Sequence, residues 1–163
     1  AALTGHLVLS TLHTNDSAGA VTRLADMEIE QFLISTAVLG VMAQRLVSKG
    51  CPDCKDEYPP KVDIPKSASK YFGTEGNNKQ PKFYRGRGCK RCRNSGYRGR
   101  ISIMEVLPMT DRIRNLVIKS ASADGIKDAA VAEGMRTLME DGWIKVAKGI
   151  TTVEEVMRVT NIE

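Results

Sequence analysis

The four cysteines of the chain stand in two short turns, Cys51-Pro52-Asp53-Cys54 and Cys89-Lys90-Arg91-Cys92. There is no other cysteine, and 34 residues separate the two pairs. Two C-x2-C turns supply the four thiolates that a tetrahedral zinc site requires, two from each turn. Because four thiolates leave no coordination position for water, the pattern predicts a structural zinc ion and not a catalytic one. We therefore expect Cys51, Cys54, Cys89 and Cys92 to meet in space.

Two other uses of these cysteines are open on the sequence alone. A pair of disulfides requires an oxidising compartment, and the N-terminal residues Ala1 to Thr4 show neither the basic nor the apolar region of a secretion signal. A redox-active pair needs one C-x-x-C turn, so two turns at this spacing fit that use poorly. The zinc interpretation is favoured over both.

The positive charge of the chain is concentrated in the cysteine segment. The net charge is +5 over 163 residues, yet residues 51–100 hold 13 Lys and Arg against 5 Asp and Glu. The basic residues around the second cysteine pair are Arg85, Arg87, Lys90, Arg91, Arg93, Arg98 and Arg100. They balance the formal charge of about −2 of a tetrathiolate zinc site, form a partner surface, or bind nucleic acid. Aromatic residues make up only 5% of the chain, so nucleic acid is the least favoured partner.

Hydrophobic patterns predict α/β structure in the first fifty residues. The apolar run Leu7-Val8-Leu9-Ser10-Thr11-Leu12 is typical of a buried strand. A short helix is expected from Val21 to Met27, after a polar turn. A second helix is predicted from Gln31 to Val47, a stretch too short and too polar to cross a bilayer. Its expected buried positions include Phe32, Val38, Leu39, Met42 and Leu46.

The second half of the chain reads as loops, one strand and helices. Proline and glycine residues between Pro59 and Pro81 predict loops, with at most a short helix near Ser67 to Phe72. A strand is expected from Ile101 to Leu107, closed by Pro108. Helices follow, and their predicted N-caps are Thr110, Ser122, Thr137 and Thr152, the last two in capping boxes with Glu140 and Glu155.

The segment from Gly5 to Asp16 holds both histidines of the chain, His6 and His13, at the two ends of the first predicted strand. A strand end that carries hydroxyls, an imidazole and free N–H groups before a helix is suited to binding phosphate. The same residues fit an ordinary helix cap, which is the commoner arrangement. A metal site shared by the two histidines is disfavoured, because seven extended residues separate them by about 23 Å.

Several motifs together resemble one protein family, the secretion ATPases that power type II secretion and type IV pilus assembly. Gly5 to Asp16 looks like the His box of that family. Ala43 to Cys54 and Gly96 to Arg100 resemble the entry to and the exit from its tetracysteine zinc module. Gly134 to Leu138 and Gly149 to Val156 resemble its C-terminal end. The resemblance runs in register over nearly the whole chain.

The resemblance implies a RecA-like P-loop ATPase that binds ATP and Mg²⁺. It implies a homo-hexamer in the cytoplasm, peripheral to the bacterial inner membrane, that contacts the inner-membrane secretion or pilus platform proteins. It further implies that His6 and His13 lie near the nucleotide, with Thr11 and Thr14 as weaker candidates. The phosphate-binding G-x-x-x-x-G-K-[ST] loop of such ATPases is absent here. We therefore expect the C-terminal portion of a longer ATPase, with Walker A and Walker B residues upstream, no complete catalytic site and no ATPase activity of its own.

The expected fold class is α/β, the C-terminal part of a RecA-like P-loop ATPase domain with a tetracysteine zinc insertion and a C-terminal helical region. Residues 1–50 are expected to end the RecA-like core, 51–100 to form the zinc-binding module, and 101–163 to form a strand and the helical region. The expected function is to power pseudopilus assembly in type II secretion. The alternative is a type IV pilus extension ATPase of the same family. A rival of another class is a free-standing zinc-ribbon module that binds nucleic acid or protein.

Overall fold

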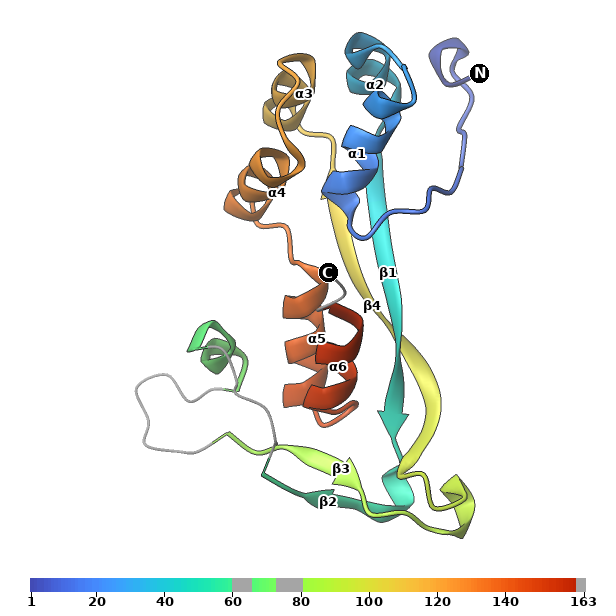
Figure 1. The fold of residues 1–163 in the computed structure, drawn as a ribbon, viewed down its shortest axis with the longest axis vertical. Coiled ribbons are helices and arrows are strands. Elements are labelled where there is room, and N and C mark those ends of the chain that lie inside the picture. The colour runs from blue at the N-terminus through green and yellow to red at the C-terminus, as the bar shows by residue number, and fades with distance from the viewer. Residues whose placement is uncertain (60–65, 73–80, 161–163) are drawn as a thin grey trace. The chain divides into compact units, whose positions relative to one another are not determined.

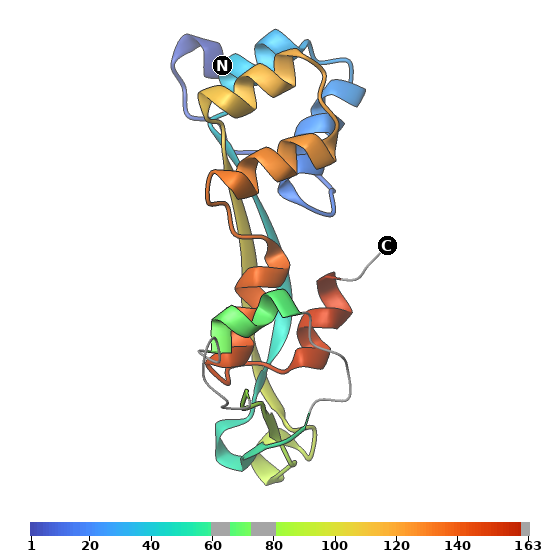
Figure 2. The same ribbon diagram turned by 90° about the vertical axis from the view of Figure 1, so that its left-hand side faces the viewer.

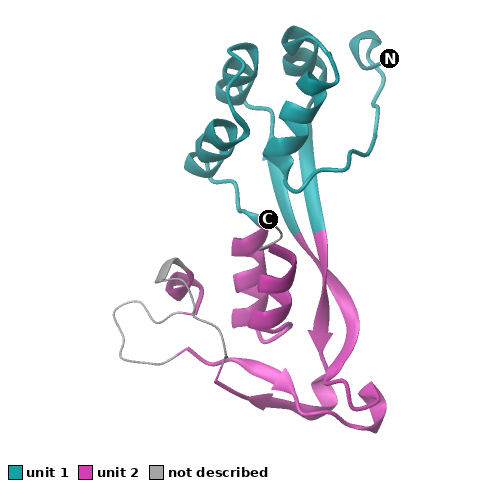
Figure 3. Cartoon of the chain, viewed as in Figure 1, with its two compact units in different colours: residues 1–44, 104–137 teal, residues 45–103, 138–163 magenta. Residues whose placement is uncertain are grey.

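The computed structural model describes residues 1–59, 66–72 and 81–160 of the chain (Figure 1). The chain divides into two compact units, and each is discontinuous in sequence. Unit 1 consists of Ala1–Gln44 and Met104–Thr137, and unit 2 consists of Arg45–Ile103 and Leu138–Glu163 (Figure 3). Helices and strands occur in both units, so the chain is a mixed α/β protein with small sheets.

Two long strands, β1 (Gly40–Gly50) and β4 (Tyr97–Pro108), pair into a two-stranded sheet. Both views show the strands side by side (Figures 1 and 2). The boundary between the two units falls within each strand. Along β4 the residues Ile103, Glu105 and Leu107 are buried and their neighbours are not, which is the alternation of a strand with one face in a core.

Backbone hydrogen bonds just beyond the two ends of the sheet define its direction. The Met109 N–H donates to the Leu39 carbonyl at 3.0 Å, and the Cys51 N–H donates to the Gly96 carbonyl at 2.9 Å. The start of one strand therefore lies opposite the end of the other, and the pair is antiparallel.

Unit 1 contains four α-helices and one 3-10 turn. They are α1 (Ser17–Asp26), α2 (Gln31–Ala37), α3 (Asp111–Ile118), α4 (Ala123–Ala132) and η1 (Ala2–Thr4). Helix α1 packs on α4, and α2 packs on α3. The buried core of the unit consists of Ala18, Val21, Ile34, Leu107, Met109, Ile113, Val117, Ile126, Ala129, Ala130 and Met135.

Side-chain caps fix where three of these helices begin. Asp16, Thr110 and Ser122 each accept a hydrogen bond from the backbone N–H three residues further along the chain. This confirms the predicted caps Thr110 and Ser122. It also shows that Asp16 is the residue of the polar turn that caps α1.

Unit 2 contains a short antiparallel sheet and two helices around a separate core. The strands are β2 (Lys55–Glu57) and β3 (Tyr84–Gly86), and the helices are α5 (Leu138–Ala147) and α6 (Val153–Thr160). The described residues of this unit also form the 3-10 segments η2 (Pro52–Cys54), η3 (Lys66–Phe72) and η4 (Lys90–Cys92). The buried core consists of Tyr58, Ala68, Phe83, Trp143, Val146, Val153 and Val156. The segment between the cysteine pairs thus shares its core with the C-terminal helices.

The predicted helix from Gln31 to Val47 is wrong beyond Ala37. Helix α2 ends there and the chain continues as β1. In the strand, Ala43 and Val47 are buried while Met42, Gln44 and Leu46 are exposed, so the side chains alternate between two faces as in a strand. Of the side chains expected to be buried, Phe32, Leu39, Met42 and Leu46 are exposed.

The predicted strand from Leu7 to Leu12 is also absent from the structure. Residues 6–14 have no regular secondary structure, and Leu7 and Leu9 are 77% and 89% exposed. A strand exists only when a second strand satisfies its backbone groups. Within the described residues the strands pair as β1 with β4 and β2 with β3, which leaves no partner for this run.

Other expectations are confirmed. Strand β4 covers the predicted strand and ends at Pro108, and η3 lies where a short helix was expected. Most of the predicted loop between Pro59 and Pro81 falls outside the described residues, and the short β2–β3 sheet at its two ends was not predicted. No helix in the described ranges is both long enough and apolar enough to span a bilayer.

A hydrogen-bonded carboxylate ties α6 to β1 in unit 2. The Ser48 N–H donates to Glu155 Oε2 at 2.6 Å, and Arg158 donates to both oxygens of Glu155 at 3.0 and 2.9 Å. The Thr151 hydroxyl donates to the Ser48 carbonyl at 2.7 Å. The Arg158 hydrogen bonds, together with the Ser48 N–H, outweigh the effect of burial and lower the pKa of Glu155 from 4.5 to about 2.

We predict that this carboxylate makes unit 2 sensitive to acid. A lowered folded-state pKa gives stability that is complete above pH 4.5 and is lost as the pH falls toward 2. Glu155→Gln should lose about 1–2 kcal/mol at pH 7 and much less at pH 3, a figure reduced for the solvent exposure of Arg158. Urea unfolding followed by Trp143, the single tryptophan, measures unit 2 directly. Glu57→Gln, which removes the exposed pair with Lys82, is the control, and an equal pH dependence in both variants would contradict the assignment.

Candidate metal centre

The four cysteine side chains lie in one cluster in unit 2. All four Sγ atoms are within 4.8 Å of one another. The Sγ–Sγ distances are 3.9 Å for Cys51–Cys89, 3.9 Å for Cys54–Cys92 and 3.7 Å for Cys89–Cys92. A tetrahedral site with metal–sulfur bonds of about 2.3 Å places its sulfurs about 3.8 Å apart, whereas a disulfide requires about 2.05 Å. The four thiols are free, and their spacing fits a metal ion.

Local backbone structure aims the thiols at one another. Cys51 directly follows β1, and Cys54 ends the 3-10 turn η2. Cys89 caps the second 3-10 turn, η4, and Cys92 ends it. The two C-x2-C segments therefore have the same local form, a 3-10 turn that brings its first and last side chains to one side.

Backbone N–H groups surround the sulfurs. Gly88 N donates to Cys54 Sγ at 3.3 Å, and both Cys89 N and Gly96 N donate to Cys92 Sγ, at 3.1 and 3.3 Å. Gly88 and Gly96 have φ of 102° and 76°, a region open mainly to glycine. Hydrogen bonds from N–H donors stabilise the charged form of a thiol, so these backbone groups favour thiolates at Cys54 and Cys92.

The thiol pKa values differ within the cluster. Burial raises the pKa of Cys51, and it raises that of Cys54 to about 12 with the help of the neighbouring thiols. Burial acts in the same direction on Cys92, but the N–H donors from Cys89 and Gly96 outweigh it and lower its pKa to about 6. Four sulfurs this close repel one another once ionised, so the arrangement favours a cation at its centre.

Part of the surrounding positive charge is already paired. Asp53 accepts hydrogen bonds from Arg91 at 3.0 Å and from Arg98 at 3.5 Å, and Arg87 contacts Asp56 at 2.7 Å. Arg85 lies over the Tyr58 ring at 5.2 Å. The other three basic residues near the second cysteine pair are Lys90, Arg93 and Arg100. None of them forms an ion pair with another described residue.

The predicted nucleotide-binding residues lie in unit 1, outside regular structure. His6, Thr11 and His13 are exposed, and His6 Nδ1 is 3.0 Å from the Thr4 hydroxyl. The Thr14 hydroxyl donates to the Asp16 carbonyl at 3.1 Å, inside the turn that precedes α1. The role of these four residues in nucleotide binding stays a prediction.

A buried polar cluster in the same unit was not predicted from the sequence. Glu105 of β4 is 1% exposed, and its Oε1 accepts hydrogen bonds from the Ser17 N–H and hydroxyl at 3.0 and 2.5 Å. The sequence contains an indication of this position. Glu105 alternates with Ile103 and Leu107 along the predicted strand, so its side chain is expected on the face that points into the core. A charged residue type at a core position marks a specific contact.

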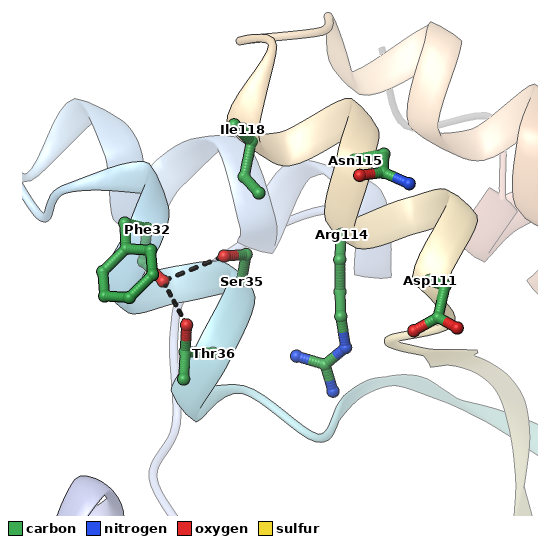
Figure 4. A pocket seen from close by; sticks show the side chains of 7 residues that line it. All are labelled: Phe32, Ser35, Thr36, Asp111, Arg114, Asn115 and Ile118. Carbon is green, nitrogen blue, oxygen red and sulfur yellow. Dashed lines mark hydrogen bonds between the residues drawn. The ribbon is translucent and has the colours of Figure 1, made fainter.

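A pocket of about 620 Å³ lies in unit 1 between α2 and α3 (Figure 4). Its lining residues are Phe32, Ser35, Thr36, Asp111, Arg114, Asn115 and Ile118. The Ser35 and Thr36 hydroxyls both donate to the Phe32 carbonyl, so their protons are engaged within α2. None of the predicted metal-binding or nucleotide-binding residues lines this pocket.

The fold and the cluster define an α/β protein with a four-thiol site able to hold a metal ion. Residues 1–158 match the family described as Type II/IV secretion system protein, and the chain belongs to this family. Over 161 residues the chain is 48% identical to the type II secretion system ATPase E of Vibrio cholerae, covering 98% of this chain and 31% of that protein. Over 160 residues it is 47% identical to the type IV pilus assembly ATPase PilB of Thermus thermophilus, covering 98% of this chain and 18% of that protein.

A third relative, the type II secretion system protein E of Pseudomonas aeruginosa, is 47% identical over 163 residues, which are 100% of this chain and 31% of the relative. The chain therefore spans less than a third of the length of each of these relatives. The resemblance found in the sequence motifs is confirmed.

We predict that metal affinity depends on a close backbone contact beside the cluster. A Cβ added at Gly86 of β3 would lie 2.2 Å from the Gly96 carbonyl oxygen, next to the N–H that donates to Cys92. Gly86→Ala should therefore weaken binding of added zinc by about 10-fold or more, the usual cost of disturbing a metal site's supporting contacts. Competition against a coloured chelator measures the affinity.

Gly50→Ala is the matched control for this variant. It lies in the same unit, and the nearest atom to an added Cβ is 3.8 Å away. Equal zinc affinities of Gly86→Ala and Gly50→Ala would show that the β3 contact does not support the site.

Proposed function

We propose that the chain is the C-terminal portion of a hexameric cytoplasmic ATPase that powers type II secretion by driving pseudopilus assembly. The observation that carries this proposal is the 48% identity to a type II secretion ATPase over 98% of the chain. A type IV pilus extension ATPase is the second candidate, favoured by the 47% identity to PilB. Both candidates couple ATP hydrolysis to machinery in the inner membrane.

The proposed fold of the parent domain is a RecA-like P-loop ATPase. In this arrangement residues 1–50 end the ATPase core, residues 51–100 form the zinc-binding module and residues 101–163 form the strand and the C-terminal helical region. ATP and Mg²⁺ would be held mainly by residues outside this chain, since the sequence contains no phosphate-binding G-x-x-x-x-G-K-[ST] loop. The chain on its own is then inactive.

We propose that Cys51, Cys54, Cys89 and Cys92 hold a structural zinc ion. Sulfur spacing near that of a tetrahedral site and N–H donors to two of the sulfurs support this choice. Zinc bound there would close the two turns on each other and add no reactive position, because all four ligands come from the protein.

We further propose that His6 and His13 lie near the nucleotide in the parent ATPase, with Thr11 and Thr14 as weaker candidates. His13 is the stronger of the two histidines, because it lies three residues before Asp16, which caps the start of α1, and helix N-termini commonly bind phosphate. The inner-membrane secretion or pilus platform is the proposed partner, and the protein would act at the cytoplasmic face of that membrane.

A partner surface for the zinc module is supported by Lys90, Arg93 and Arg100, which form no ion pair with another described residue. The same cations favour the rival function, a ribbon that binds nucleic acid. A salt series separates the two, since DNA binding at low micromolar affinity with a steep salt slope would support the rival.

Zinc should stabilise unit 2 selectively. At free zinc of about 1,000 times the dissociation constant, the folded form gains about 4 kcal/mol. We expect a chelator to lower the urea midpoint reported by Trp143, which packs in the unit 2 core, while much of the helical circular dichroism from unit 1 persists. Identical Trp143 transitions with and without the chelator would contradict a structural metal.

His13 should matter for turnover and not for folding. In the longer protein that we propose contains this chain, His13→Ala should lower the kcat for ATP by about 10-fold or more, in the range of a lost transition-state contact, with unchanged thermal unfolding. The change is tolerable because His13 is exposed and packs in no core. Leu9→Ala, an exposed apolar residue in the same segment, is the control, and wild-type turnover in His13→Ala would refute the assignment.

A further inference from the structure

The buried carboxyl group of Glu105 has no part in the proposed metal centre. It comes from β4, lies inside unit 1 and is 1% exposed. Its Oε1 accepts from both donors of Ser17, the N–H at 3.0 Å and the hydroxyl at 2.5 Å, and the same hydroxyl lies 3.8 Å from Met135 Sδ. Burying a carboxyl group is unfavourable unless specific donors compensate. The two hydrogen bonds from Ser17 supply these donors, and they hold Ser17 against β4.

Ser17 is the first residue of α1 and lies four residues after His13. The residue before it, Asp16, is held from two directions. Asp16 Oδ1 accepts from the Gly19 N–H at 2.8 Å, and Oδ2 accepts from Lys127 Nζ of α4 at 2.8 Å. The Asp16 carbonyl accepts from the Thr14 hydroxyl at 3.1 Å. The turn that carries His13 is therefore bound at consecutive residues to β4 and to α4.

Within the described part of the chain, the residues on the other side of His13 form no comparable contacts. Residues 6–12 are exposed and lack regular structure, and the nearest upstream contact is that of His6 with Thr4. Among the described residues, the contacts that hold the turn with His13 are the downstream ones at Asp16 and Ser17. Helix capping alone does not explain them, because Asp16 already caps α1 through Gly19.

We propose that Glu105 and Lys127 are positioning residues for His13. They hold Asp16 and Ser17, and through them the His13–Thr14 turn, so that the imidazole is presented at a fixed place before the N-terminus of α1. The inference rests on the proposed role of His13 near the nucleotide. It extends that role by connecting the His13–Thr14 turn to β4 and to helix α4, which packs on α1.

The test of positioning uses the fact that the chain has only two histidines. In chain labelled with ¹³C-histidine, Glu105→Gln should shift or broaden the imidazole signal of His13 and leave that of His6 in place. Lys127→Met should do the same, and Lys127→Arg, which keeps the ion pair with Asp16, should restore the signal. Because Lys127 is only part-buried, the Lys127 variants keep the test decisive should Glu105→Gln fail to fold.

Glu133→Gln is the control, because its carboxylate accepts from the exposed Thr110 hydroxyl elsewhere in unit 1. An unchanged His13 signal in folded Glu105→Gln or Lys127→Met would overturn the positioning role. So would an equal disturbance of both histidines, which would indicate a general loss of structure.

A kinetic measurement in the longer protein separates this inference from the proposed function. Glu105→Gln and Lys127→Met should lower kcat by about 10-fold with KM for ATP changed little, because the lost contact orients a group and binds no substrate, and Lys127→Arg should recover turnover. If the Glu105→Gln and Lys127→Met variants shift the His13 signal, but these variants and His13→Ala all keep wild-type turnover, the role of His13 in turnover is refuted. The anchoring of His13 by Glu105 and Lys127 is then still supported. Reduced turnover with an undisturbed His13 signal would refute the positioning and leave the proposed function standing.

Discussion

Backbone hydrogen bonds between β1 and β4 join two segments that are separated by residues 51–96. The bond from the Cys51 N–H to the Gly96 carbonyl, at the end of this pairing, sets the first cysteine pair beside the chain that leaves the second. Closing so long a loop loses conformational entropy. The hydrogen bonds between β1 and β4 offset much of this loss before any metal binds. The four sulfurs can then reach tetrahedral spacing without rearrangement of the backbone.

Unit 2 does not consist of a metal site alone. Tyr58, from the segment between the cysteine pairs, packs with Trp143 and donates to Glu154 of α6 at 2.6 Å. Tyr97, just after the second pair, lies 3.0 Å from the Thr152 hydroxyl at the start of α6. The proposed zinc module is thus joined to the C-terminal helices by apolar and polar contacts. A structural change in the proposed zinc module would therefore reach α6 through these contacts.

The sequence was sufficient for features that depend on local chemistry. The two C-x2-C turns predicted the cysteine cluster, and the hydroxyl residues Thr110 and Ser122 predicted the starts of α3 and α4. These features follow from residue type and spacing within a few positions, where tertiary contacts have little influence.

Features that depend on distant partners were predicted poorly. Val41 to Val47 has apolar residues at positions that fit either a helix or a strand, and only pairing with β4 selects the strand. The run Leu7 to Leu12 has the composition of a strand and lies outside any sheet, for want of a partner strand among the described residues. Glu105 was overlooked because its two donors come from Ser17, 88 residues away in the sequence.

The claim that the four cysteines form a tetrathiolate zinc site is tested most directly by X-ray absorption at the zinc edge of the purified chain. A closed tetrathiolate site should give a single shell of four sulfur atoms at about 2.3 Å, with no nitrogen or oxygen neighbour. A shell that contains oxygen or nitrogen would contradict a closed structural site. Protein that carries no zinc, with its cysteines in disulfides, would contradict the metal centre itself.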